Sequence, residues 1–281
     1  MNDESTSIRV ERRAAVGTIT LDRPERFNSL DVQTAQDLRR AGLALARDES
    51  IRCVVLRGRA EVFCSGVDLK YVHEGGRRDE LTYLMPDAVG TEAASFGAIF
   101  KQVLEYINST ISEIRRAPKP FVAAVEGVSA AGGLGLALCC DLVVASELAT
   151  FEWAYGKTGL SGAESATFLL PKLIGLRGAL DLSLLSPRLD ARAAFARGLV
   201  SAVYEAADFE FEVASLATRL ASGPTAAFAR QKRLLNRAAG MDALEAHLDA
   251  EVAELVECAD SDEFATGLER FVGGRRRKKD G

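Results

Sequence analysis

Short β-branched runs alternate with amphipathic segments over the first two hundred residues of the chain. Residues 33–47 place Leu38 and Leu45 on one helical face, and Asp31 precedes them as the expected N-cap. Residues 99–116 repeat apolar side chains at helical spacing, and the small residues of 131–138 suit a tightly packed helix. The strands expected from short apolar runs are residues 8–11, 15–21, 51–56, 121–125, 142–145 and 150–154.

The order of these segments predicts an α/β fold with a mainly parallel sheet. The first two strands are close enough to form a hairpin, and the later strand–turn–helix units imply right-handed βαβ crossovers. Residues 70–95 lack a clear pattern and are expected to form a mobile loop or lid. The helices expected beyond residue 205 are residues 211–221, 225–238, 242–259 and 264–271. We therefore expect a core over residues 1–205 and a helical region over residues 206–281.

The composition excludes several classes of protein. The chain has 281 residues, 48% of them hydrophobic, so it can bury a core and is not disordered. No apolar stretch is long enough for a membrane helix, and the polar N-terminus has no leader pattern. The net charge is −5, and the basic tail at 275–281 carries +4, which leaves −9 for the rest. The acidic remainder argues against a nucleic-acid partner, and the tail is expected to be solvated and disordered, with anion binding as the alternative.

The five cysteines are expected to be buried free thiols. They are odd in number, most lie in apolar runs, and none has CxxC spacing. Free thiols fit a reducing compartment, so the expected location is the cytoplasm. No group of His, Cys, Asp or Glu has the spacing of a metal site, and none is expected.

Two glycine-containing turns stand where a strand is followed by a helix. One is FCSGVDLK at 63–70, and the other is GVSAAGG at 127–133. The N–H groups at a helix N-terminus are free, so two such turns side by side can direct two donors at one oxygen, as in an oxyanion hole. The alternative is that these glycines serve only tight packing between helix and strand. Asp68 is expected to cap the helix that begins at Leu69.

In this order and spacing, the motifs of the chain resemble the crotonase superfamily, also called the enoyl-CoA hydratase/isomerase family. The resemblance extends from about residue 8 to 271 and implies a crotonase-like spiral of repeated ββα units with a helical C-terminal oligomerisation region. It also implies an acyl-CoA thioester as substrate, no covalently bound cofactor, and a homotrimer or a dimer of trimers. The matching segments are LDRPERFNSL (21–30), FCSGVDLK (63–70), PKPFVAAVEGVSAAGGLGLALCCDLVVAS (118–146), FEWAYGKTGL (151–160), RLDARAAFARGLV (188–200) and GPTAAFARQKRLLN (223–236).

The same resemblance assigns the residues of the site. The N–H groups of Val67 and Gly132 match the two donors to the thioester carbonyl. Lys70 and Arg26 match positions near the nucleotide end of coenzyme A, where basic side chains meet phosphates. Ser65, in the first turn, is added to them as a residue expected to contact coenzyme A.

The chain departs from the hydratases of this family, which use two glutamates. Gly135 stands at the first of these positions and Tyr155 at the second. Glycine cannot transfer a proton, and a tyrosine with a pKa near 10 is a poor base at neutral pH. Hydration by the usual route is therefore not expected.

One acidic residue remains near the expected site. The family carries a GLxPDGG-like segment in which several isomerases have a catalytic aspartate. Here the segment reads GLSGAES, with Ala163 at the aspartate position and Glu164 one place later. If Glu164 points inward, one carboxylate suffices for a double-bond shift. The alternative is that Glu164 only occupies the first turn of a helix, where the dipole favours a negative charge.

Three functions therefore remain open. The first is an acyl-CoA isomerase with Glu164 as base, the second is hydration by an unexpected residue, and the third is a non-catalytic binder of CoA thioesters. Trp153 and Tyr155 are expected either to line an acyl pocket or to pack in the core. Ser129 resembles the nucleophile of the related Clp protease fold, but the chain's two histidines do not lie where a triad partner is expected.

Overall fold

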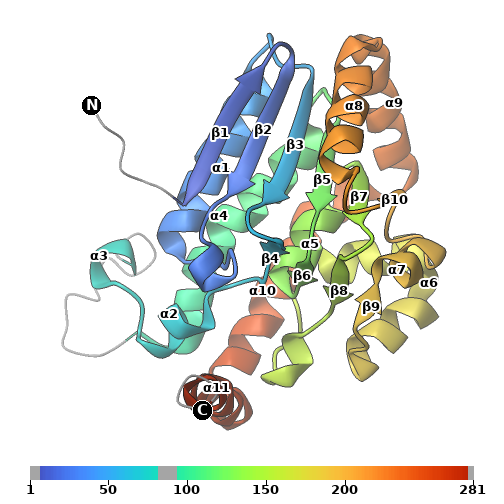
Figure 1. The fold of residues 1–281 in the computed structure, drawn as a ribbon. Coiled ribbons are helices and arrows are strands. Elements are labelled where there is room, and N and C mark those ends of the chain that lie inside the picture. The colour runs from blue at the N-terminus through green and yellow to red at the C-terminus, as the bar shows by residue number, and fades with distance from the viewer. Residues whose placement is uncertain (1–6, 82–93, 278–281) are drawn as a thin grey trace.

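The computed structural model describes residues 7–81 and 94–277, which form two sheets (Figure 1). The larger sheet contains, in spatial order, β1 (Ile8–Arg13), β2 (Val16–Leu21), β3 (Cys53–Gly58), β5 (Phe121–Val125), β7 (Leu142–Ser146) and β10 (Ala202–Tyr204). The smaller sheet contains β4 (Val62–Cys64), β6 (Val128–Ala130), β8 (Thr150–Glu152) and β9 (Leu189–Asp190).

Strand pairing follows the predicted topology. β1 and β2 form the expected antiparallel hairpin, from Ile8 opposite Leu21 to Arg13 opposite Val16. The other pairings of the larger sheet, β2–β3, β3–β5, β5–β7 and β7–β10, are all parallel. Strands β4, β6 and β8 pair in parallel below β3, β5 and β7 (Figure 1). The chain therefore passes three times from the larger sheet to the smaller one and on to helical structure, which is the crotonase-like spiral of ββα units.

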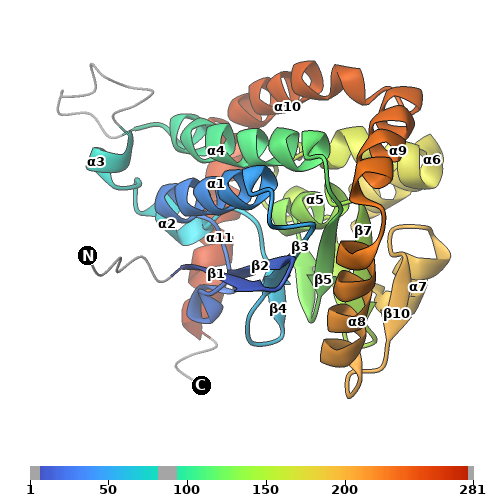
Figure 2. The ribbon, with the colours of Figure 1, turned by 90° about the horizontal axis from the view of Figure 1, so that it is seen from above.

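Helices cover both faces of the larger sheet (Figure 2). Val54 and Leu56 of β3 point into a core shared with α1 (Val32–Arg47) and α4 (Phe96–Arg116). The alternate residues, Cys53 and Val55, pack instead with the apolar face of α8 (Phe209–Ser222). Because successive side chains of a strand point to opposite faces, a short strand that is apolar throughout needs both layers.

Local sequence determines several helix starts. The side chain of Asp31 accepts a hydrogen bond from the N–H of Thr34 and caps α1, as predicted. Asp68 likewise accepts from the N–H groups of Lys70 and Tyr71 and caps α2 (Leu69–His73). α5 (Gly132–Leu138) follows β6 directly.

The chain beyond residue 205 is helical, as expected. It contains α8, α9 (Thr225–Ala238), α10 (Leu244–Ala259) and α11 (Asp262–Arg277). α10 packs along α4 (Figure 2), and α11 packs against α2, where the His73 ring and Glu269 lie 3.0 Å apart. The boundary between 1–205 and 206–281 remains a prediction.

Three expectations need correction. Within the loop or lid predicted over residues 70–95, residues 70–73 belong to α2 and residues 78–81 form α3 (Arg78–Leu81), while residues 82–93 lie outside the described residues. α11 extends to Arg277, so the basic tail begins as helix rather than as a disordered segment, and residues 278–281 are not described. Ala166–Leu185 forms α6, and Ala191–Ala196 forms α7, neither of which the apolar pattern predicts.

Candidate active site

The turn at Gly66 and Val67 directs one backbone N–H away from its neighbouring strand. The N–H of Leu30 donates to the Gly66 carbonyl, and the N–H of Asp68 donates to the Leu30 carbonyl, each at 2.9 Å. In this parallel bridge, the N–H of Val67 points to the side opposite Leu30. Gly66 has a φ of +87°, a left-handed conformation that favours glycine.

The two predicted turns touch each other. A Cβ added to Gly66 would lie 2.8 Å from the backbone nitrogen of Gly132, and one added to Gly132 would lie 3.2 Å from the Cα of Gly66. Gly132 is the first residue of α5, whose N-cap Ala131 offers no side-chain hydrogen bond. The structure therefore brings together the backbones that carry the Val67 and Gly132 amides.

Glu164 lies against the same point. Its side chain is 1% exposed, and a Cβ on Gly132 would overlap its Oε1 atom and lie 2.7 Å from its Cδ. Glu164 and Ser165 both have positive φ, and α6 begins only at Ala166. Glu164 therefore precedes the helix instead of occupying its first turn, and its carboxyl group points into the protein beside Gly132.

Tyr155 holds the other carboxyl oxygen. Its hydroxyl group donates to Glu164 Oε2, and it lies 3.2 Å from the carbonyl oxygen of Ala163. Burial raises the pKa of Glu164 to about 8; the hydrogen bond from Tyr155 opposes this shift, and the charge of Glu251 adds to it. Burial and the nearby Glu164 charge raise the pKa of Tyr155 well above its usual value, so its hydroxyl group stays protonated.

The positions of the two missing hydratase glutamates both adjoin Glu164. Tyr155 is its hydrogen-bond donor. A Cβ on Gly135 would overlap the carbonyl oxygen of Glu164 and lie 2.9 Å from its Cβ. Glycine at 135 therefore makes room for the turn that carries Glu164.

The residues expected to contact coenzyme A lie close to the first turn. Arg26 donates through Nε and Nη2 to the two carboxylate oxygens of Asp68, each at 2.9 Å. Lys70 is more than half exposed, with its ammonium group 3.7 Å from Glu74. The N–H of Ser65 donates to the Phe27 carbonyl at 3.2 Å. Their contact with coenzyme A remains a prediction.

Trp153 and Tyr155 pack as a pair in the core. Their ring centroids are 4.9 Å apart, and both side chains are buried. Gly162, with a φ of +106°, lies against the Trp153 ring, since a Cβ there would be 2.6 Å from Cη2. The two rings thus support the loop that leads to Glu164, and a role in lining an acyl pocket remains a prediction.

Ser129 lacks the partner that a nucleophilic serine needs. Its Oγ is buried and has no hydrogen-bond partner within residues 7–81 and 94–277. The rings of His73 and His247 lie instead beside Glu269 and Thr167. The described residues therefore place neither histidine as a partner of Ser129.

Glu251 is a site residue that the sequence analysis missed. Its carboxylate, on α10, accepts hydrogen bonds from the N–H groups of Ser165 and Thr167, next to Glu164. Glu251 lies more than eighty positions beyond Glu164 in an amphipathic helix, so no local motif marks it.

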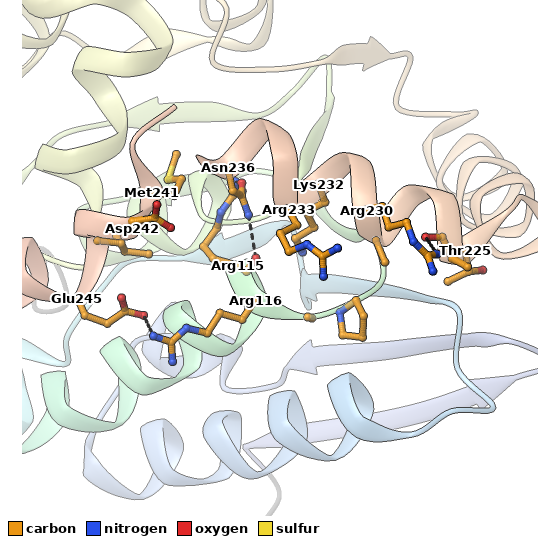
Figure 3. Close-up of a pocket in the computed structure, with 15 residues that line it drawn as sticks. Arg115, Arg116, Thr225, Arg230, Lys232, Arg233, Asn236, Met241, Asp242 and Glu245 are labelled. Atoms are coloured by element: carbon orange, nitrogen blue, oxygen red, sulfur yellow. Dashed lines mark hydrogen bonds and ion pairs between the residues drawn. The ribbon is translucent and has the colours of Figure 1, made fainter. Parts of the chain in front are cut away.

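A cavity of about 640 Å³ lies at a different place, between the end of α4 and helix α9 (Figure 3). Much of its basic lining is already engaged: Arg116 pairs with Glu245 at 2.7 Å, and Arg115 donates to Asn236.

Among the described helices, none has both the length and the hydropathy needed to cross a bilayer. In the same part of the chain, no three His, Cys, Asp or Glu side chains are grouped as metal ligands. The cysteines are free: four are buried and Cys258 is half-buried.

Similarity to known proteins agrees with this architecture. The model of the enoyl-CoA hydratase/isomerase family matches residues 11–279. The 4-chlorobenzoyl coenzyme A dehalogenase-2 of an Arthrobacter species is 30% identical over 264 residues, which are 94% of this chain and 90% of that protein. The 1,2-epoxyphenylacetyl-CoA isomerase of Escherichia coli K12 is 31% identical over 260 residues, covering 92% and 93% of the two chains.

A solved structure shares the whole fold. The crystal structure of an enoyl-CoA hydratase from Mycobacterium avium subsp. paratuberculosis K-10 matches with a TM-score of 0.81 at 31% identity, covering 95% of this chain and 96% of that one. The names of these three proteins refer to three different reactions, so similarity alone does not choose the reaction here. The spiral fold and the extent of these matches show that the chain belongs to the enoyl-CoA hydratase/isomerase family, within the crotonase superfamily.

Proposed function

We propose that this protein is an acyl-CoA isomerase in which Glu164 moves a proton between two carbons of the acyl chain. The observation that carries the proposal is the position of Glu164: its buried carboxyl group lies beside Gly132 and has a pKa of about 8. A group with a pKa near the working pH can both take and return a proton. A double-bond shift needs one such group, whereas hydration requires a carboxylate to activate water and an acid to protonate Cα.

The two amides supply the second part of the mechanism. Removal of the proton next to a thioester carbonyl places negative charge on the carbonyl oxygen. The N–H groups of Val67 and Gly132 are the donors proposed to bind this enolate oxygen, and the contact between Gly66 and Gly132 supports their convergence. Donors of this kind are worth about 3 kcal/mol each in enzymes where one has been removed.

Tyr155 has a supporting role in this mechanism. Its hydroxyl group donates to Oε2 of Glu164 and leaves Oε1, on the Gly132 side, to exchange the proton. Because Tyr155 remains protonated, it can stabilise the ionised carboxylate throughout the pH range in which Glu164 titrates. Tyr155 is therefore assigned as the residue that orients the base.

The substrate proposed is an unsaturated acyl-CoA. Lys70, Arg26 and Ser65 remain the proposed contacts of its coenzyme A part. Two of the relatives named above carry benzoyl and phenylacetyl groups in the names of their substrates. An aromatic or other bulky acyl group is accordingly the first to test, together with straight-chain 3-enoyl-CoA.

The test is an assay for conversion of a 3-enoyl-CoA to its 2-enoyl isomer. The reaction is monitored by the ultraviolet absorbance of the conjugated thioester that forms. Glu164→Gln is expected to lower kcat by about a thousandfold, because proton transfer by a positioned group contributes at least a hundredfold. Glu105→Gln is the matched control, since Glu105 is an exposed carboxylate on α4. Full activity in Glu164→Gln contradicts the assigned base. Rapid addition of water to crotonyl-CoA favours hydration by another residue, and tight binding without turnover favours a non-catalytic binder.

A further inference from the structure

Glu251 is a buried carboxylate that the proposed mechanism does not use. Its side chain comes from α10 and is 2% exposed. Its Oε2 accepts the N–H of Ser165 at 2.8 Å, and its Oε1 accepts the N–H of Thr167 at 3.0 Å. The hydroxyl group of Thr167 donates to the same Oε1. Three donors from the start of α6 therefore converge on one carboxylate.

The N–H groups of Ser165 and Thr167 bond to Glu251, whereas those of Ala166 and Phe168 find acceptors within the segment, the carbonyl groups of Ala163 and Ser165. Ser165 is the N-cap of α6, yet its side chain caps nothing, and its Oγ has no partner among the described residues. The first N–H groups of a helix need acceptors from outside the helix. A carboxylate from α10 here replaces the Ser, Thr or Asp side chain that usually caps a helix from its own chain segment.

The same segment has a strained backbone. Glu164 has a φ of +52° and Ser165 a φ of +65°, two consecutive left-handed residues with side chains. Such conformations are costly and persist only when surrounding contacts hold them. Tyr155 fixes the carboxyl end of Glu164, and the bonds to Glu251 fix the main chain that follows it.

We propose that Glu251 is a positioning residue, which holds the Ser165–Thr167 main chain so that the carboxyl group of Glu164 stays beside Gly132. This inference rests on the proposed role of Glu164 as base. It assigns to the C-terminal helical region a part in the reaction: α10 completes the turn that presents the base.

The groups around Glu164 also predict a change in its protonation. Tyr155 from the segment after β8 and Glu251 from α10 shift the pKa of Glu164, and the charge of Glu164 in turn raises the pKa of Cys64 on β4. His247 of α10 lies 3.9 Å from Glu251. The charge of Glu251 opposes ionisation of Glu164. Removing that charge should therefore lower the pH at which Glu164 ionises.

The decisive variant is Glu251→Gln, which keeps the size of the side chain but loses the charge and one acceptor oxygen. Its kcat is expected to fall at least about tenfold, since small displacements of a reacting group are costly. The KM for the CoA thioester should remain within about twofold, because Glu251 is not a proposed substrate contact. The rise of rate with pH should move to lower pH. Glu254→Gln, an exposed carboxylate one turn further along α10, is the matched control and should behave as the parent enzyme.

A crystal structure of Glu251→Gln and an infrared titration of the Glu164 carboxyl band give readouts that need no activity. Displacement of the 164–167 turn and a lower titration midpoint are expected. If Glu164→Gln is inactive while Glu251→Gln keeps the parent's kcat, pH profile and turn, the positioning role is overturned and the base assignment stands. If Glu164→Gln is fully active, the proposed function fails. The crystal structure of Glu251→Gln and the infrared titration of its Glu164 carboxyl group then still show whether Glu251 positions the 164–167 turn.

A second variant covers the case in which Glu251→Gln does not fold. Thr167→Val removes one of the three donors to Glu251 while keeping the shape of the side chain. A fall in kcat with an unchanged KM, smaller than the tenfold expected for Glu251→Gln, supports the proposal. Kinetics like those of the parent, together with an undisplaced 164–167 turn, overturn it.

Discussion

At neutral pH, the burial of the Glu164 carboxyl group favours its protonated form, whereas a role as base requires its ionised form. Burial raises its pKa to about 8, so the protonated form is favoured at pH 7. In the proposed mechanism the ionised form is the base, whereas the buried site favours the protonated form. The balance between them sets both the pH dependence of the rate and that of the stability.

The first prediction concerns the rate. If ionised Glu164 is the base, kcat/KM for a 3-enoyl-CoA should rise with pH through a single step near 8. Tyr155→Phe removes the hydrogen bond that favours the ionised carboxylate, so the step should move to higher pH. Initial rates between pH 6 and 10 measure both profiles. A step that keeps its position in Tyr155→Phe would contradict the contact between these two residues.

The second prediction concerns stability and does not depend on any activity. The ordinary pKa of a glutamate is 4.5, and that of folded Glu164 is about 8, so the native state binds more protons than the unfolded chain between these values. The free energy of unfolding should therefore fall as pH rises through this window because of Glu164. Glu164→Gln removes this pH-dependent loss of stability. The Tm of the variant minus the Tm of the parent should therefore be more positive at pH 9 than at pH 5. Equal differences at both pH values would argue against the raised pKa.

The third prediction concerns the missing hydratase carboxylate. Gly135→Glu restores the residue type that the hydratases carry, but its Cβ would overlap the carbonyl oxygen of Glu164. The variant should lose stability, by about 2 kcal/mol as for other overpacked sites, and should gain no hydration of crotonyl-CoA. Urea unfolding and a hydration assay test the two parts. Gly273→Ala is the control, because a Cβ there meets no atom within 4 Å.

At the scale of elements, the sequence predicted what local pattern determines. The strand at Phe121–Val125 was placed correctly because it is a short run of apolar residues, and the helix at Thr225–Ala238 because its apolar residues recur at helical spacing. α6 was missed because it is kinked at Gly175, which has a positive φ, and contains Pro171, so its apolar residues form no single stripe along its length. A helix of this kind has no amphipathic stripe to recognise.

In the candidate site, too, local motifs were predictable from the sequence and long-range contacts were not. The glycine turns at Gly66 and Gly132 are local and were found from the sequence, with the help of the family resemblance. The contact of Glu164 with Tyr155 requires two positive-φ residues that no sequence pattern announces. The contact with Glu251 exists only because α10 folds back to α6, which no reading of neighbouring residues reveals.

The fourth prediction concerns how α9 is attached to the core. The nearly buried ammonium group of Lys232 lies 2.8 Å from Asp141 and donates to the Ile114 carbonyl at 2.7 Å. Lys232→Met removes these contacts, while Asp141 keeps the N–H of Phe121 and the guanidinium of Arg115. The free energy of unfolding should therefore fall by about 2 kcal/mol, as for the loss of hydrogen bonds to a charged group. Urea unfolding measures the loss, with Lys101→Met, on the exposed face of α4, as control. Equal stability of the two variants would show that this ion pair does not hold α9.

At the scale of the whole molecule, α6 presents an apolar surface that residues 7–81 and 94–277 leave exposed. Leu176, Leu180 and Leu184, spaced four residues apart after the left-handed Gly175, are 66%, 47% and 77% exposed. Leucines spaced by four lie on one helical face, and contiguous exposed apolar surface marks an interaction site. The family resemblance predicts a homotrimer or a dimer of trimers, and this face gives that prediction a surface to test.

The fifth prediction follows from that surface. Light scattering should give the parent a mass of three or six chains, because closed symmetry buries such a face on every copy. Leu180→Glu combined with Leu184→Glu places charges within the apolar face and should lower the measured mass toward that of one chain. Leu148→Glu, at an isolated exposed leucine between β7 and β8, should leave the mass unchanged. A parent that is monomeric would refute the predicted assembly, and an assembled double variant would assign the interface to a face other than that of α6.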